Sequence, residues 1–271
     1  MNGASREALA AARERLDALT DSTSADAARL AEDLAAVTAL LDREVSLRRV
    51  LTDPAQAAER KAELVRQLLT GQVGGTAVDL VAGMVRSRWS QPRDLVDSTE
   101  ELSATAELTQ AERVGALDDV EDELFRFGRI VESSPELRSA LTDRSATSAA
   151  KTGLLRDLLG GRANPATERL VERLVTRPRG RSLEAGLQAL SRLAAARRNR
   201  LVAVVTSAVP LTDRQKQRLG AALSKLYGHP MHLNLDVDPE VLGGISVRVG
   251  DEVINGTVAE RLDEATRRLA G

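Results

Sequence analysis

The chain contains one segment twice, at a separation of 90 residues. Between Leu47 and Gly71, 11 of 25 aligned positions are identical to the residues 90 positions later, without a gap. The identical pairs are Leu47 and Leu137, Arg48 and Arg138, Leu51 and Leu141, Thr52 and Thr142, Asp53 and Asp143, Lys61 and Lys151, Leu64 and Leu154, Arg66 and Arg156, Leu68 and Leu158, Leu69 and Leu159, and Gly71 and Gly161. A period of 90 is too long for one solenoid unit, which spans about 20–50 residues. We therefore expect each copy to be a small bundle of its own.

Apolar residues recur at helical spacing through most of the first 200 positions. Val120, Leu124, Phe127 and Val131, for example, are separated by four, three and four residues, which places them on one face of a helix. The same spacing joins Leu30, Leu34, Val37 and Leu41, then Leu170, Val171, Leu174 and Val175, and finally Leu183, Leu187, Leu190 and Leu193. Glycines at 71, 74–75 and 160–161 predict helix ends. Asp53-Pro54 predicts an N-cap with a proline in the first turn of a new helix.

The pattern changes after Arg200. Leu201–Val209 is an uncharged, β-branched run of strand length, and Thr212-x-x-Gln215 has the spacing of a capping box. That box opens a helix predicted over about Asp213–Tyr227. Alternating residues then predict strands around 233–237 and 245–249, the second forming a hairpin with Val253 and Ile254, and Thr257-x-x-Glu260 predicts a terminal helix.

These patterns predict a mainly α fold with a small α/β C-terminal domain. Two tandem helical bundles, an additional one in 1–105 and a second in 106–199, precede a roughly four-stranded sheet with two helices in 200–271. Strand, helix and strand in succession predict a parallel pair with a crossover connection.

Composition excludes several classes of protein. Cysteine is absent, so disulfide frameworks, thiolate metal sites and cysteine nucleophiles are excluded. No uncharged stretch exceeds 12 residues, whereas a membrane-spanning helix needs about 20 apolar residues. The N-terminus is charged from Arg6 onward and lacks the apolar core of a signal peptide. We therefore expect a cytosolic chain without a membrane span.

The search for catalytic motifs favours no enzyme, no metal site and no cofactor. The chain lacks the phosphate-binding, dinucleotide-binding, serine-hydrolase and zinc-protease motifs. His229 and His232 flank a proline, which is typical of surface turns rather than of metal ligands. Gly243-Gly244 is followed by a strand, whereas a phosphate site needs a helix N-terminus. We interpret Gly243, Gly244, Gly250 and Gly256 as structural turn residues.

The basic stretch Arg177–Arg200 carries few acids and could face RNA or anionic lipid. The chain has only four aromatic residues, so a solvated helix face or an acidic protein partner is the favoured interpretation. Amphipathic bundles also offer apolar grooves for a partner helix. Candidate wall residues lie in the second bundle, where most must also build the core: Leu124, Phe127, Leu137, Leu141, Leu154, Leu158, Leu170 and Leu174.

Three stretches resemble a known family. They are Val204–Leu211, Ser134–Gly161 and the segment from Val237 to Thr257, which reads VDPEVLGGISVRVGDEVINGT. From about residue 118 onward the chain resembles the delta subunit of F-type ATP synthase, called the oligomycin-sensitivity-conferring protein in mitochondria. It departs from the family in having Asn255-Gly256-Thr257 where Asp-Gly-Ser is usual, and in its additional first 100 residues.

The resemblance implies a non-catalytic stator subunit of the peripheral stalk, which connects the catalytic head to the stalk during proton-driven ATP synthesis. The helical domain would bind N-terminal helices of alpha subunits, and the C-terminal domain would meet b-type stalk subunits. The protein would then be part of a hetero-oligomer, peripheral at the cytoplasmic face of the cell membrane, without nucleic acid. We expect the second bundle to keep the alpha contact. The additional bundle could bind a second alpha helix or brace a modified b-type stalk. The alternative is a helical adaptor or RNA-binding protein that uses Arg177–Arg200.

Overall fold

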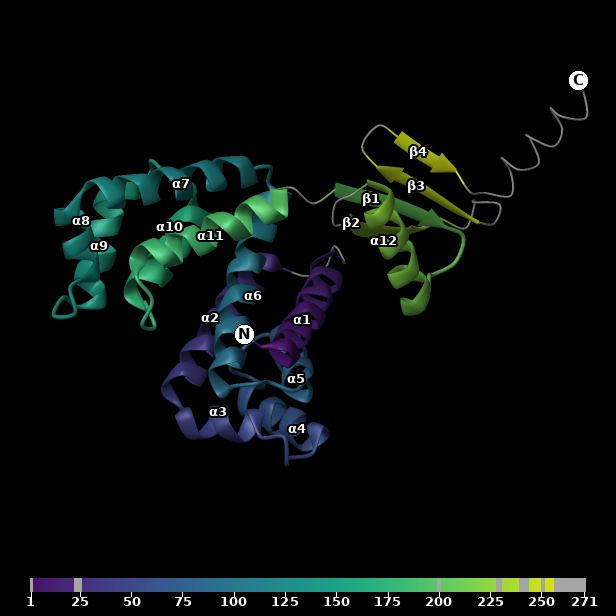
Figure 1. Cartoon of the computed structure of the whole chain (residues 1–271), viewed down its shortest axis with the longest axis horizontal. Helices are drawn as coiled ribbons and strands as arrows, with labels where there is room; N and C mark the ends of the chain where they lie inside the picture. Colours follow the sequence, from purple (N-terminus) through teal and green to yellow (C-terminus); the bar gives the residue numbers. More distant parts are fainter. Residues whose placement is uncertain are drawn as a thin grey trace, which may run out of the picture. The chain divides into compact units, whose positions relative to one another are not determined.

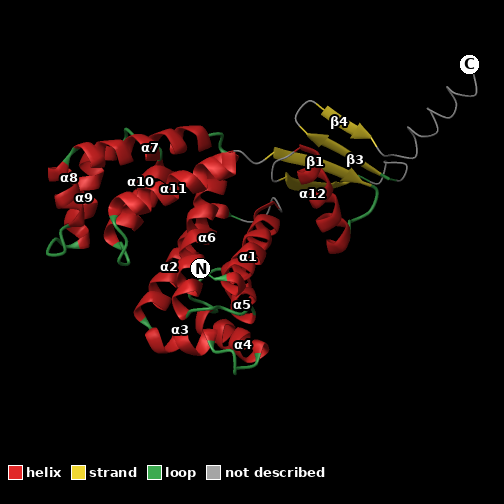
Figure 2. Ribbon diagram, viewed as in Figure 1, coloured by secondary structure: helices red, strands yellow, loops and turns green. Residues whose placement is uncertain are grey.

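The structure is a computed structural model, and it describes residues 2–21, 26–198, 201–227, 231–238, 244–249 and 252–255. The chain divides into two compact units, 1–195 and 196–271. Among the described residues the first unit is built from helices and the second contains the sheet (Figure 2). The prediction of a mainly α protein with a small α/β C-terminal part is confirmed.

The helices of the first unit repeat with the sequence. Their bounds are α1 (Gly3–Asp21), α2 (Ala27–Arg43), α3 (Val45–Thr52), α4 (Ala58–Leu69), α5 (Gly75–Arg86), α6 (Pro92–Arg113), α7 (Leu117–Ser133), α8 (Pro135–Thr142), α9 (Ser148–Leu159), α10 (Pro165–Thr176) and α11 (Leu183–Arg198). Adding 90 to both ends of α2, α3, α4 and α5 gives the ends of α7, α8, α9 and α10. We call α1–α6 the first repeat and α6–α11 the second.

Helix α6 belongs to both repeats. Adding 90 to the residue numbers of α1 gives a range inside α6, and adding 90 to those of α6 gives a range that includes all of α11. Figure 1 shows α6 reaching from the group α1–α5 into the group α7–α11. Leu95 and Leu102 lie in the core of the first repeat, whereas Leu108 and Ala111 lie in the core of the second. The boundary predicted between residues 105 and 106 therefore falls inside a continuous helix, and the two bundles are joined by a shared element.

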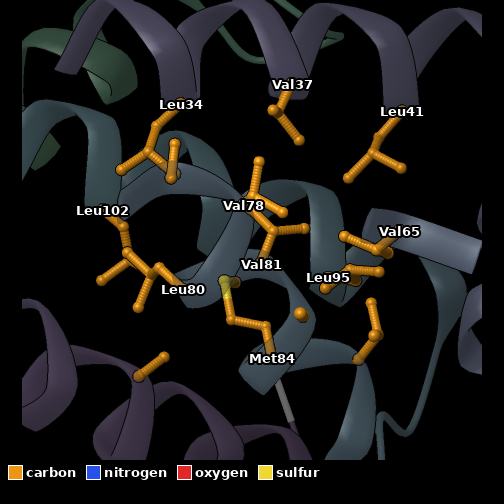
Figure 3. Packing of buried hydrophobic residues seen from close by; sticks show 14 of the residues in the cluster. Leu34, Val37, Leu41, Val65, Val78, Leu80, Val81, Met84, Leu95 and Leu102 are labelled. Atoms are coloured by element: carbon orange, nitrogen blue, oxygen red, sulfur yellow. The ribbon is translucent and has the colours of Figure 1, made fainter. Parts of the chain in front are cut away.

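Each repeat has its own apolar core. In the first, α2 contributes Leu34, Val37 and Leu41, which face Val78 and Val81 of α5 (Figure 3). In the second, the equivalent helices α7 and α10 contribute the buried residues Leu124, Val131, Val171 and Val175. These are the residues whose helical spacing marks one face in the sequence, so the periodicity and the packing agree.

The chain reverses after α3 and α8 in turns of the same construction. Thr52 and Thr142 donate their hydroxyls to the carbonyls of Arg48 and Arg138, four residues earlier. Asp53 then accepts the backbone N–H of Ala55 at 2.9 Å. The prediction that Asp53 is an N-cap was wrong, because it is the C-cap of α3 and α4 begins only at Ala58. Asp-Pro is compatible with either a turn or a helix start, and here it forms the turn.

The described part of the second unit contains a four-stranded sheet in the order β2-β1-β3-β4. Strand β1 (Leu201–Ser207) pairs in parallel with β2 (Met231–Val237) and antiparallel to β3 (Ile245–Val249), which forms the predicted hairpin with β4 (Glu252–Asn255). Helix α12 (Asp213–Tyr227) connects β1 to β2 and opens with the predicted capping box, in which Thr212 and Gln215 exchange hydrogen bonds.

A small core lies between α12 and the sheet, where Leu223 packs against Val205 and Val247. Gly244 adopts a left-handed φ of 85°, which favours glycine at this turn. Gly243, Gly250, Gly256 and the predicted terminal helix lie outside the described residues.

Candidate partner-binding grooves

A groove of about 1050 Å³ lies between α1, the end of α3 and the segment that joins α5 to α6. Ala4, Ala8 and Ala11 of α1 form one side, and Val50 lies on the other. Its remaining lining residues are Glu7, Arg49, Thr52, Asp53, Pro54, Lys61, Ser87, Arg88, Trp89, Ser90 and Pro92. We call this the first groove.

A second groove, of about 900 Å³, lies in the second repeat between α8, the start of α9, the end of α10 and the start of α11. Seven of its lining residues stand 90 positions after residues of the first groove: Ser139, Thr142, Arg144, Lys151, Pro178, Gly180 and Ser182, which match Arg49, Thr52, Pro54, Lys61, Arg88, Ser90 and Pro92. The duplication has therefore produced two grooves at equivalent places, one in each repeat.

Each groove contains a lysine with little exposure. Lys61 is 6% exposed and Lys151 is 9% exposed. Within the part of the chain that the structure describes, neither ammonium group has a hydrogen bond or an ion pair. Burial lowers the pKa of Lys61, and the nearby charge of Asp53 opposes that shift. Both lysines belong to the identical pairs of the sequence repeat, but their charge was not recognised there as part of a site.

The turn after α8, which contributes Arg144 and Ala146 to the second groove, contains a hydrogen-bonded acid. Asp143 accepts the backbone N–H and the hydroxyl of Ser145, each at 2.8 Å. These hydrogen bonds lower the pKa of Asp143, and the positive charge of Lys151 lowers it further.

The eight wall residues predicted from the sequence divide into two groups. Leu124, Phe127, Leu141, Leu170 and Leu174 are buried in the second core. Leu137, Leu154 and Leu158 are half-buried, and the first two pack against that core. Only Leu141 and Leu174 also line the second groove. A partner contact at any of the eight stays a prediction, and the five buried side chains are mainly engaged with their own bundle.

The two repeats are joined by ion pairs as well as by α6. The Arg179 side chain, 3% exposed, pairs with Glu100 at 2.7 Å and Asp97 at 2.5 Å, both on α6, and with Asp42 of α2 at 3.3 Å. Arg179 adopts a left-handed φ of 52°, and its carbonyl accepts a hydrogen bond from Arg93. One residue of the α10–α11 connection is therefore held by three carboxylates of the first repeat.

A buried carboxylate secures the other side of α6. Glu107 is 1% exposed at its side chain and pairs with Arg169 at 2.6 Å and with Arg173 at 3.3 Å, both on α10. The hydrogen bond to Glu107 raises the pKa of Arg169, whereas burial lowers the pKa of Arg173. Two cations around one buried acid satisfy its charge inside the molecule.

The basic stretch is therefore partly used inside the protein. Arg179 is enclosed by acids, Arg181 pairs with Glu100 at 2.5 Å, and Arg197 is only 7% exposed. Exposed arginines of the same stretch include Arg177 and Arg192. This arrangement favours intramolecular anchoring over a continuous surface for RNA.

Among the residues that could be described, no group of three or more acidic or histidine side chains is placed to hold a metal ion. In that same part of the chain, no helix is both long and apolar enough to cross a membrane.

The structure is therefore that of a scaffold protein, in which two helical repeats with equivalent grooves are followed by a small α/β unit. The family described as ATP synthase delta (OSCP) subunit matches residues 99–269. That match begins inside α6 and so covers the second repeat together with the C-terminal unit. The chain belongs to this family, and the resemblance inferred from the sequence is confirmed.

Curated relatives share the whole length of the chain, including the first repeat. ATP synthase subunit delta of Streptomyces griseus is 79% identical over 271 residues, which cover 100% of both chains. The protein of the same name from Streptomyces coelicolor is 75% identical over 270 residues, or 100% of this chain and 98% of the relative. That of Thermobifida fusca is 49% identical over 271 residues and covers 100% of both chains.

Proposed function

We propose that this chain is a non-catalytic stator subunit of the ATP synthase, which connects the catalytic head to the b-type stalk during proton-driven ATP synthesis. The observation that carries the proposal is the family match over residues 99–269, together with the 79% identity to a delta subunit along the full length. The subunit would act as part of a hetero-oligomer, peripheral at the cytoplasmic face of the cell membrane.

In this proposal the second repeat binds N-terminal helices of alpha subunits, because it is the helical part that the family match covers. The second groove supplies a concave surface beside it, lined by Leu141, Leu174 and Leu183 as well as by arginines. Each apolar side chain that a docked helix buries there would contribute about 1.5–3 kcal/mol. The small α/β unit would meet the ends of b-type subunits.

A stator must transmit force between its attachment points without yielding. The continuous helix α6, the three acids around Arg179 and the buried pairs of Glu107 support this role, since they hold the two repeats as one body. Within that body, relative movement of the repeats would break several partly buried ion pairs at once.

The proposal is tested by ATP synthase assembled with and without this chain. Without it, the head should still hydrolyse ATP, but proton-driven ATP synthesis should be lost, and adding the purified chain should restore it. Unchanged proton-driven synthesis in the complete absence of the chain would contradict the stator function.

A further inference from the structure

The connection between α10 and α11 forms part of one wall of the second groove. Pro178, Gly180 and Arg181 of this connection line the groove, between the end of α10 and the start of α11. The side chain of Arg179, which stands between them in the chain, is 3% exposed and pairs with acids of the first repeat. The same short connection therefore shapes the groove and contacts the neighbouring repeat.

The backbone of this connection is held from the side of the first repeat. Arg179 and Gly180 both adopt a left-handed conformation, with φ of 52° and 77°. Such a φ is unfavourable for a residue other than glycine, and it persists only where the surroundings hold it. Here the guanidinium donates to Asp97 at 2.5 Å and to Glu100 at 2.7 Å, and Arg93 donates to the Arg179 carbonyl. These three partners lie in the half of α6 that contributes to the first core.

The equivalent residue of the first repeat is anchored in a different way. Trp89 stands 90 positions before Arg179, in the connection between α5 and α6. Its ring is buried in the first core, and its Nε1 donates to the Met84 carbonyl at 2.9 Å. The first repeat thus secures this connection within its own core, whereas the second repeat secures it through acids of its neighbour.

We infer that the first repeat supports one wall of the second groove, and that Arg179 is the positioning residue. Its ion pairs with Asp42, Asp97 and Glu100 fix the connection, and the neighbouring residues of the connection carry that position into the groove. A wall that is already held in place need not be ordered when a partner binds, so the support favours binding. The inference rests on the proposed function only for the identity of the partner that occupies the groove.

The absence of cysteine from the sequence allows two spin labels to be placed across the groove of the full-length chain. Ala140→Cys on α8 and Arg177→Cys at the C-cap of α10 change exposed residues outside the described lining of the groove. Pulsed electron paramagnetic resonance then measures the distribution of distances between the two labels. For the parent chain we expect one narrow distribution, because the connection is held in one position.

Removal of the supporting acids should broaden this distribution although no lining residue changes. In Asp42→Asn/Asp97→Asn the width should increase about twofold, since the wall then samples more than one position. Arg179→Met should have the same effect, and Arg179→Lys, which keeps a cation, should stay closer to the parent. The matched control Glu59→Gln/Glu63→Gln removes two carboxylates that pair with arginines inside the first repeat, and it should keep the parent's width. Equal widths in the parent and in Asp42→Asn/Asp97→Asn would overturn the inference.

A binding measurement connects the support to the partner. The probe is a synthetic N-terminal peptide of an alpha subunit, which should bind Asp42→Asn/Asp97→Asn severalfold more weakly than the parent and the control. The reason is that only a fraction of the variant molecules would hold the wall in the binding position. Equal affinities for all three proteins would count against the support. A peptide that does not bind the parent chain would contradict the proposed partner, while the distance measurement would still decide the support, so the two can fail separately.

Discussion

The carboxylate of Glu123 on α7 accepts the backbone N–H of Asn164, the N-cap residue of α10, at 2.9 and 3.0 Å. In the first repeat Asp33 on α2 does the same for Gly74, the N-cap residue of α5, at 2.9 Å. The two pairs stand 90 residues apart in the chain. An acid that satisfies the first exposed N–H of a helix from another helix ties the two elements together.

Removal of this carboxylate should destabilise the second repeat. Glu123 also accepts the hydroxyl of Thr167, so Glu123→Ala leaves two donors without their acceptor. We expect a loss of about 1.5–3 kcal/mol in the free energy of unfolding, the range for hydrogen bonds to charged groups. Urea denaturation measures it. The neighbouring Asp122→Ala, which removes only an exposed ion pair with Arg126, should cost no more than about 1 kcal/mol. Equal losses in the two variants would contradict the structural role of Glu123.

Two helical glycines should respond oppositely to alanine. A Cβ added at Gly153 in α9 meets nothing within 4 Å, so Gly153→Ala should stabilise by up to about 1 kcal/mol through helix propensity. At Gly186 in α11 the same Cβ would lie 2.3 Å from Cδ1 of Leu174, which is buried in the second core. Gly186→Ala should therefore destabilise by about 1–3 kcal/mol, because the core must shift. The melting temperatures of the two variants test both expectations. A Gly186→Ala variant that melts at a higher temperature than the parent protein would show that α11 does not pack against Leu174 in this way.

Arg179 should hold the repeats together. Arg179→Met leaves Asp42, Asp97 and Glu100 without their common cation, and these acids are 25–45% exposed. Because solvent screens these partly exposed acids, we expect the free energy of unfolding to fall by only about 1–3 kcal/mol. Arg181→Met, which removes a single exposed partner of Glu100, serves as the matched control and should cost less than about 1 kcal/mol. Hydrogen exchange should also rise in the α10–α11 connection of Arg179→Met. Unchanged exchange and stability would exclude this anchoring role.

Acid should weaken the turn after α8. Hydrogen bonds from Ser145 hold the pKa of Asp143 below its ordinary value, so ionised Asp143 stabilises the fold above the unfolded pKa of about 3.9. That contribution is lost as the pH falls through the folded pKa. Asp143→Asn should therefore be less stable than the parent protein at pH 7, and the difference should shrink at pH 3. Urea midpoints at both pH values provide the comparison; a difference that did not change with pH would argue against ionic stabilisation.

The sequence predicted the elements whose buried residues keep one periodicity. Val120, Leu124, Phe127 and Val131 mark a single face of α7, so both the helix and its core side could be read from spacing. Helix α6 was harder to predict from apolar spacing, because it is buried on more than one side. It carries small polar residues such as Ser98, Ser103 and Thr109 at buried positions. A helix that contacts two cores has no single apolar stripe, which is why the predicted boundary between the bundles, at residues 105 and 106, falls inside α6.

The grooves were harder to predict than the fold. Their lysines appear in the repeat as identical residues, but a sequence does not show that Lys61 is buried without an ion-pair partner among the described residues. The contacts of Asp33 and Glu123 were also not predicted. The two equivalent positions hold different acids, and each acid accepts from a residue 41 positions later in the chain. The leucines chosen as groove walls were selected by helical spacing, and that spacing identifies core residues first.

Affinity purification of the intact ATP synthase through a tag on this chain tests the central claim most directly. The stator function predicts that alpha and b-type subunits are recovered together with the chain, under conditions that preserve the assembled enzyme. Recovery of the chain without either kind of subunit, from a preparation in which the synthase itself remains assembled, would contradict it.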